Sequence, residues 1–162
     1  MSSINPFWEF STALYEQPGV AETCIEAQDR WGADVNLLLF FAWQSQGGIP
    51  MQLDAIASLD AEISAWRRQV VTPIRELRRK LKAFPGADAS RALIQQAELA
   101  AERAQQDLML THAGSETRVG GGQGLRAYLD LYTEFLRLPG EAFDDVHSVF
   151  ESGLEKLASV QG

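Results

Sequence analysis

The feature of this sequence that most constrains its fold is a short segment without a polar side. Seven consecutive residues, Leu37 to Trp43, are apolar, and they lie in a segment of helical length at 35–46. A helix that is apolar all round is buried on every side. The longest strongly apolar stretch, Val35 to Trp43, is interrupted by Asn36 and is only about half as long as a membrane-spanning helix requires. We therefore expect residues 35–46 to form the central helix of a globular protein, with Asp34 as its N-cap.

Turn-forming residues divide the rest of the chain into further segments of helical length. Glycine and proline gather at 18–19, 47–48, 85–86, 120–122 and 139–140. Such clusters mark turns. Apolar residues between them recur at helical spacing, and alternating or β-branched runs are almost absent. The sequence predicts an all-α fold, a single helical bundle of about six to seven helices. The expected helices span 6–16, 20–31, 35–46, 53–82, 90–111, 123–138 and 141–158.

Local signals refine this expectation. Asn5 is suited to cap the first helix, and Pro6 to occupy its first position. Pro73 lies inside the expected helix 53–82, where it removes one backbone donor, so that helix should bend near Gln69 or Val70. We expect residues 1–162 to form one domain, with the glycine-rich residues 112–124 as a mobile loop.

Charge is distributed unevenly along the chain. The formal net charge is −8, yet residues 66–82 hold seven basic side chains and one acidic one, whereas residues 1–65 hold nine acidic and one basic. An acidic chain repels polyanions at long range, and the basic segment lacks the motifs of nucleic-acid-binding folds, so we do not expect nucleic acid as a partner. The N-terminus lacks the features of a signal peptide, which predicts a cytoplasmic protein with Cys24 as a thiol.

Few residues in this sequence could carry catalysis. Two histidines, His112 and His147, and one cysteine cannot make a zinc tetrad of Cys and His, and only one Asp-x-x-His element is present where a di-iron bundle needs two Glu-x-x-His elements. Cys24 lies on an apolar stripe, where burial disfavours its thiolate. We therefore expect no catalytic residues, no metal and no cofactor. His112 is expected at the end of a helix and His147 at the boundary of the core.

The basic segment divides into two sets of side chains when it is placed on a helix with about 100° per residue. The apolar stripe of this helix consists of Trp66, Val70, Ile74, Leu77 and Leu81. The candidate exposed basic face lies opposite and consists of Arg68, Arg75, Arg79 and Lys82. Arg67 and Arg78 lie closer to the stripe and should be partly buried. Because a buried charge without a partner costs several kcal/mol, both require carboxylates or a bound anion.

The acidic residues nearest the central helix are the expected partners of these arginines. Asp29, Asp34 and Asn36 lie at its start, where Asp34 and Asn36 could also serve only as caps for the first turn. We predict that Arg67 or Arg78 pairs with Asp29 or Asp34. This would make the five residues a polar cluster inside the protein.

Two blocks of residues form a distinctive signature. The first runs Phe7-Trp8-Glu9-Phe10-Ser11, then Gln28-Asp29, Gly32 and Asp34-Val35-Asn36-Leu37-Leu38-Leu39-Phe40. The second runs Trp66-Arg67, Val70-Val71, Pro73, Arg75, Leu77-Arg78-Arg79 and Leu81-Lys82. Together they resemble a proteobacterial family of small conserved cytoplasmic proteins of unknown function, over about residues 7–82. The resemblance implies no activity, but it implies that the two blocks belong to one unit.

Two functional hypotheses remain. The first is a non-enzymatic helical interaction or adaptor protein with a protein partner. A homodimer through helix 90–111 is one form of it, because small alanines on its heptad seam permit close helix packing. The seam consists of Ile94, Ala97, Ala101, Ala104 and Leu108. The second is a protein that binds a small molecule or an anion, phosphorylated or isoprenoid-like, and could be an enzyme. Its aromatic pocket would consist of Trp8, Tyr15, Trp31, Trp43 and Trp66, with Asp29, Asp34, Asn36 and Arg78 as polar groups.

Overall fold

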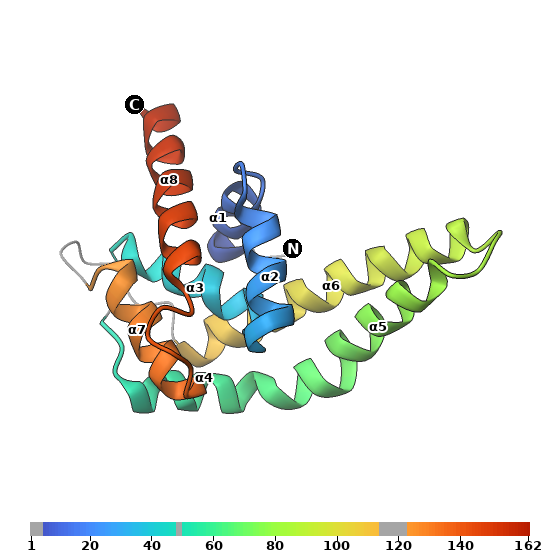
Figure 1. The fold of residues 1–162 in the computed structure, drawn as a ribbon, viewed down its shortest axis with the longest axis horizontal. Helices are drawn as coiled ribbons and strands as arrows, with labels where there is room; N and C mark the ends of the chain where they lie inside the picture. Colours follow the sequence, from blue (N-terminus) through green and yellow to red (C-terminus); the bar gives the residue numbers. More distant parts are fainter. Residues whose placement is uncertain (1–4, 48–49, 114–122) are drawn as a thin grey trace. The chain divides into compact units, whose positions relative to one another are not determined.

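The computed structural model describes residues 5–47, 50–113 and 123–162, and within these ranges it contains helices and no strand (Figure 1). The helices are α1 (Pro6–Tyr15), α2 (Val20–Trp31), α3 (Val35–Ser45), α4 (Leu53–Trp66), the π-helix η1 (Arg67–Val71), α5 (Thr72–Leu81), α6 (Asp88–Ala113), α7 (Leu125–Leu136) and α8 (Asp144–Gln161). Since α4, η1 and α5 follow one another without a break, the described part of the chain contains seven continuous helices. The prediction of an all-α fold is confirmed.

The chain folds into two compact units. Unit 1 consists of residues 1–58 and 116–162, and unit 2 consists of residues 59–115. Helix α4 begins in unit 1 and continues into unit 2. That the whole chain behaves as one domain stays a prediction. Of the expected mobile loop at 112–124, His112 and Ala113 belong to α6, and residues 114–122 lie outside the described residues.

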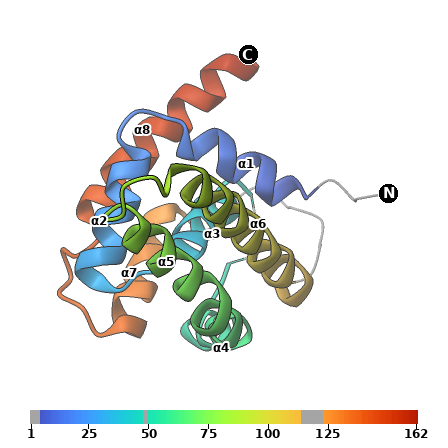
Figure 2. The ribbon, with the colours of Figure 1, turned by 90° about the vertical axis from the view of Figure 1, so that its right-hand side faces the viewer.

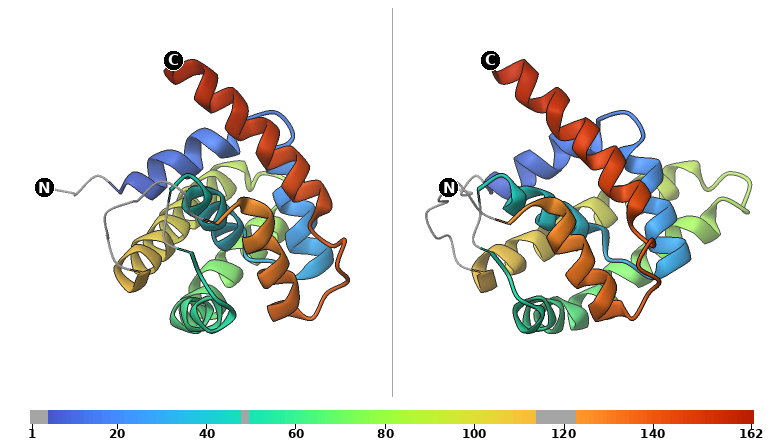
Figure 3. Two further views of the ribbon diagram at one scale, coloured as in Figure 1. Left: turned by 90° about the vertical axis from the view of Figure 1, so that its left-hand side faces the viewer. Right: turned by 60° about the vertical axis from the view of Figure 1, so that its left-hand side comes forward.

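Helix α3 is the centre of unit 1. Every residue from Asn36 to Trp43 is buried, and α3 packs against α1, α2 and α7 (Figure 3). Its N-cap is Asp34, whose carboxylate accepts a hydrogen bond from the backbone N–H of Leu37 at 3.2 Å. The prediction of a central, fully buried helix is confirmed for this unit, because a segment without a polar face has no side that favours water.

Aromatic rings fill the space around α3. On one side, Phe7 of α1 contacts Phe40 edge-on and stacks on Trp43, with ring centroids 5.4 and 5.3 Å apart. On the other side, Phe41 stacks on Tyr128 of α7 at 5.8 Å. Such ring pairs add to the free energy of burial and fix the orientation of the helices.

Unit 1 is closed by α8, which packs against α1, α2 and α7 (Figure 3). Gly153 lies where α8 packs closely on α1, because a Cβ atom built there would lie 2.9 Å from Cδ1 of the buried Leu14. The expected cap of α1 is confirmed as well, since Asn5 accepts a hydrogen bond from the N–H of Trp8 at 3.0 Å.

Unit 2 is a helical hairpin in which the continuous helix α4–η1–α5 turns back at residues 82–87 into α6. Helices α5 and α6 lie side by side along the hairpin (Figure 1 and Figure 2). The expected distortion at Pro73 takes the form of η1, where the N–H of Thr72 bonds to the carbonyl of Arg67, five residues back. A π turn contains one more residue than an α turn.

This additional residue changes which side of α5 faces α6. A regular helix would place Val70 and Leu77 in the buried stripe. Instead Val71 is buried, and Leu77 is 44% exposed. Beyond η1 the predicted stripe is wrong at Leu77, whereas Ile74 and Leu81 are half-buried, because the sequence argument assumed 100° per residue throughout. The side chains that follow η1 are displaced by about one position around the helix.

Candidate functional site

Two arginines of α5 and two glutamates of α6 form an ion cluster in unit 2. Arg75 donates through Nε to Glu98 Oε1 at 3.0 Å and through Nη2 to Glu102 Oε1 at 3.1 Å. Arg78 donates through Nε to Glu98 Oε2 and through Nη2 to Glu98 Oε1. Glu98 therefore accepts hydrogen bonds from both guanidinium groups, and the cluster links α5 to α6.

The Glu98 carboxylate is the most buried member of this cluster, with 9% of its side chain exposed. Burial by itself would raise the pKa of Glu98. The hydrogen bonds from Arg78 and Arg75, together with their positive charges, outweigh burial and hold the pKa of Glu98 below its ordinary value. Glu98 is thus an ionised carboxylate that balances guanidinium charge, and its pKa is lowered, the opposite of what a proton donor near neutral pH requires.

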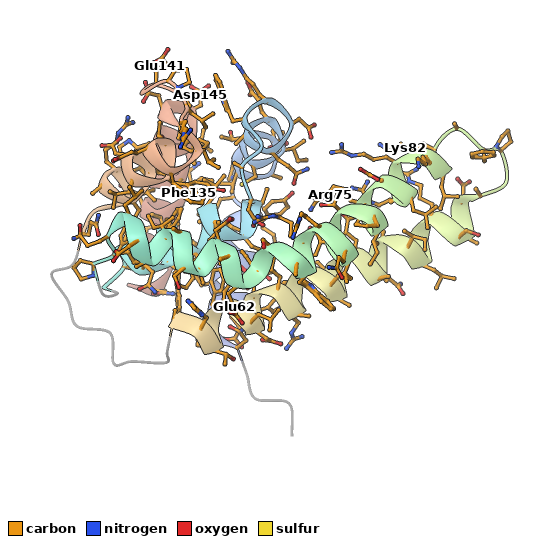
Figure 4. The ribbon with its side chains drawn as sticks, turned by 90° about the horizontal axis from the view of Figure 1, so that it is seen from below. Glu62, Arg75, Lys82, Phe135, Glu141 and Asp145 are labelled. Carbon is orange, nitrogen blue, oxygen red and sulfur yellow. The ribbon has the colours of Figure 1, made fainter. Side chains whose placement is uncertain are left out.

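The position of Arg75 corrects the sequence analysis. We expected Arg75 on the exposed basic face, but its side chain is only 18% exposed and contacts Glu98 and Glu102. The displacement that follows η1 turns Arg75 toward α6, and Figure 4 labels it on α5 within the hairpin. Sequence reasoning missed Glu98 and Glu102 because nothing in their local pattern distinguishes them from solvated helix residues.

Arg67 has a carboxylate partner on the preceding turns of the same helix. Its Nη1 donates to Asp60 Oδ1 at 2.8 Å, and both side chains are half-buried. The expectation that Arg67 and Arg78 are partly buried and contact carboxylates is confirmed. The carboxylates within unit 2 are Asp60 for Arg67 and Glu98 for Arg78.

The predicted pairs with Asp29 or Asp34 would join residues of different units, so they stay a prediction. Asp29 is exposed on α2. Asp34 and Asn36 are buried at the start of α3, and the backbone N–H of Asp34 donates to the hydroxyl of Tyr132 on α7 at 3.0 Å. The capping role expected for Asp34 is confirmed by its bond to Leu37.

The remaining basic side chains of this segment lie on the outside of unit 2. Arg68, Arg79, Lys80 and Lys82 are all exposed, and we call these four residues the basic surface. Three of them belong to the predicted exposed face. The fourth is Lys80, which belongs to the exposed face where the sequence analysis had placed Arg75. This difference follows from the displacement after η1. Figure 4 labels Lys82 near the turn of the hairpin.

The aromatic residues of the predicted pocket do not belong to one unit. Trp8, Tyr15, Trp31 and Trp43 lie in unit 1, whereas Trp66 lies in unit 2 and donates through Nε1 to the carbonyl of Ala101 at 2.9 Å. Within unit 1, Trp43 is packed against Phe7 and Phe40. The ligand-binding hypothesis therefore receives no support from the arrangement within either unit.

The other candidate groups are Cys24 and the two histidines, and their surroundings suit a structural role. Cys24 is buried, and burial raises its pKa to about 12, so its thiol stays protonated at neutral pH, as expected. His112 lies 3.8 Å from Glu62 near the end of α6, and the half-exposed His147 lies 3.7 Å from Glu151. Among the residues that the structure describes, no group of three or more His, Cys, Asp or Glu side chains could hold a metal ion.

One polar group on unit 1 was not anticipated from the sequence. Arg126 of α7 donates to Asp130 at 3.0 Å and to Asp144, at the start of α8, at 2.7 Å. Its hydrogen bond to Asp144 is the main reason that the pKa of Arg126 is raised. The group is exposed, so it fixes the connection between α7 and α8 with a modest contribution to stability.

These observations define an all-α protein in which an ion cluster links the two helices of a hairpin, α5 and α6. Within the described ranges, no helix is both long and apolar enough to cross a membrane. The family described as Protein of unknown function (DUF2390) matches residues 6–109, and the chain belongs to this family. The match contains both signature blocks and continues beyond them through most of α6. No curated protein and no solved structure matches the chain.

Proposed function

We propose that this protein is a non-enzymatic interaction module that binds an acidic protein partner through the basic surface of unit 2. The observation that carries the proposal is the division of the basic side chains. Arg75 and Arg78 are held by Glu98 on α6, whereas Arg68, Arg79, Lys80 and Lys82 are exposed. Exposed lysine and arginine side chains attract a partner of opposite charge.

The net charges of the two units support an acidic partner that binds unit 2 rather than unit 1. Unit 1 contains 15 acidic and five basic residues, whereas unit 2 contains seven acidic and nine basic residues. Unit 1 therefore repels an acidic partner at long range, and unit 2 attracts it. The net charge of −8 of the whole chain disfavours nucleic acid, since it repels a polyanion at long range. The cytoplasmic location of the protein stays a prediction.

Charge reversal at two lysines tests this proposal. We would compare the wild-type protein with K80E/K82E and with the control R30E/K156E, which changes the net charge equally at exposed sites of unit 1. Each protein is used for affinity capture from the cells that express it, and bound proteins are identified by mass spectrometry. We expect acidic proteins captured by wild type and control to be lost with K80E/K82E.

The capture must also weaken with salt, because exposed charges are screened over about 8 Å at physiological ionic strength. Circular dichroism verifies that all three proteins are folded. Identical captured proteins for the three, or a set without acidic members, would contradict the proposal.

A further inference from the structure

Helix α6 carries an exposed apolar face that is separate from the basic surface. Leu93, Ala97, Ala100, Ala104 and Leu108 follow one another at intervals of four, three, four and four residues, which places them on one side of the helix. We call these five residues the alanine face. Leu93 is 66% exposed, Ala97, Ala100 and Leu108 are also exposed, and Ala104 is half-buried.

This face differs from the seam expected from the sequence. Heptad positions would have included Ile94 and Ala101 in the exposed seam, but Ile94 is half-buried and Ala101 is buried. The side of α6 that contains Ala101 also contains Glu98, which contacts Arg75 and Arg78 of α5. The exposed face is therefore the neighbouring one, which runs through Ala100.

The order of residues on the alanine face is the same in both directions. Leu93 and Leu108 lie equally far from the midpoint between Ala100 and Ala101, and so do Ala97 and Ala104. The symmetry extends by one turn at each end, where the exposed Ser90 and Thr111 are also equidistant from this midpoint. A face with this order is complementary to itself when a second helix runs antiparallel to it.

We propose that α6 binds α6 of a second copy of this chain, antiparallel, with a two-fold axis near Ala100. Leucines at both ends then pack against each other, Leu93 of one copy with Leu108 of the other. The three alanines between them let the backbones approach closely. An interface of this kind is isologous, because the same residues contribute from both copies. The proposal goes beyond the basic surface and does not depend on it.

The charges near the alanine face fit a second copy. No charged residue belongs to the face itself, and interface centres are typically depleted of charge. Gln96, Arg103 and Asp107 border the face along one edge. In the antiparallel register, Gln96 of one copy lies midway between the levels of Arg103 and Asp107 of the other, two residues from each. An amide accepts from a guanidinium and donates to a carboxylate, so this edge is complementary to itself.

The net charge of the units favours the same pairing. Unit 1 has ten more acidic than basic residues, so two copies repel each other through it. Unit 2 is nearly balanced, and a dimer formed through α6 brings together the least repulsive parts of two chains. The face is small compared with a standard interface of about 800 Å² per partner, so we expect a dimer that dissociates on dilution.

Sedimentation velocity over a range of protein concentrations tests the proposal. The wild-type chain should shift from monomer to dimer as its concentration rises. L93E and, separately, A97E place a charge on the face of both copies, and each should weaken dimerisation at least about a hundredfold. L99E is the matched control, because Leu99 is exposed on another side of α6. K80E/K82E should dimerise like wild type, which separates this proposal from the proposed function.

Cysteine substitution tests the register of the two helices. A100C should form a disulfide-linked dimer under mild oxidation, because Ala100 lies next to the two-fold axis, whereas L99C should not. The native Cys24 is buried and unreactive, so it does not interfere. A monomer at every concentration, dimerisation that persists in folded L93E and A97E, or equal linkage of A100C and L99C would overturn the proposal. Circular dichroism confirms folding, and L93E remains decisive if A97E does not fold.

Discussion

Replacing Glu98 by alanine removes the carboxylate to which Arg75 and Arg78 both donate. Hydrogen bonds that involve charged groups each contribute about 1.5–3 kcal/mol, and removing one partner of a fully buried ion pair costs about 3–5 kcal/mol. The arginine side chains remain about one-fifth exposed, and Arg75 keeps its bond to Glu102. We therefore expect E98A to lower the free energy of unfolding by about 2–4 kcal/mol.

The measurement is urea denaturation followed by circular dichroism, with wild type, E98A, E98Q and E102Q compared at neutral pH. E98Q keeps the shape and one acceptor oxygen but loses the charge, so its loss should be smaller than that of E98A. E102Q is the matched control, because Glu102 is more exposed and Arg75 keeps Glu98 as a partner. A loss below about 0.5 kcal/mol for E98A, the range of ordinary surface substitutions, would refute the ion cluster as a link between α5 and α6.

Three further predictions concern pH and packing. Because the folded-state pKa of Glu98 lies below its unfolded value, its contribution to stability is complete above the unfolded pKa of about 4.3 and is lost as the pH falls through the lower, folded value. Acid titrations of wild type and E98Q should differ in this range, and parallel curves would contradict the lowered pKa. G153A should destabilise by about 1 kcal/mol in thermal denaturation, since the new methyl group meets Leu14 at 2.9 Å and outweighs the helix propensity of alanine. Stabilisation would disprove the close approach. Y132F removes the acceptor for the buried N–H of Asp34 and should cost about 1–2 kcal/mol in urea denaturation, whereas no loss would mean that another acceptor replaces it.

The helices and their caps could be predicted because their signals are local. Asn5 and Asp34 are polar residues placed directly before an apolar helical segment, and each caps the helix that follows. The limits predicted for α2, residues 20 and 31, agree with the structure, because Gly19 and Gly32 adopt the left-handed conformation that glycine favours. Membership of a family of unknown function was also anticipated, whereas its proteobacterial origin and the signature blocks stay predictions.

The partners of the arginines could not be predicted, because they depend on a non-local fact. Burial of Arg67 and Arg78 demanded carboxylates, but nothing in the sequence indicates that α6 runs back along α5 in a register that places Glu98 beside Arg78. The π turn before Pro73 is the second reason. A proline predicts a distortion, but it does not specify whether the chain bends or gains a residue in that turn, and only the latter brings Arg75 inward.

The ion pairs between α5 and α6 depend on the number of residues in the π turn at Arg67–Val71. Shortening this stretch by a single residue would restore ordinary helical winding and swing everything after it round by about 100°. Leu77 would then point at α6, and Arg75 would leave Glu98 and Glu102 for solvent. An insertion or deletion in this turn is thus far more disruptive than the substitution of one side chain. A family member with a different number of residues in this turn would need other contacts between α5 and α6.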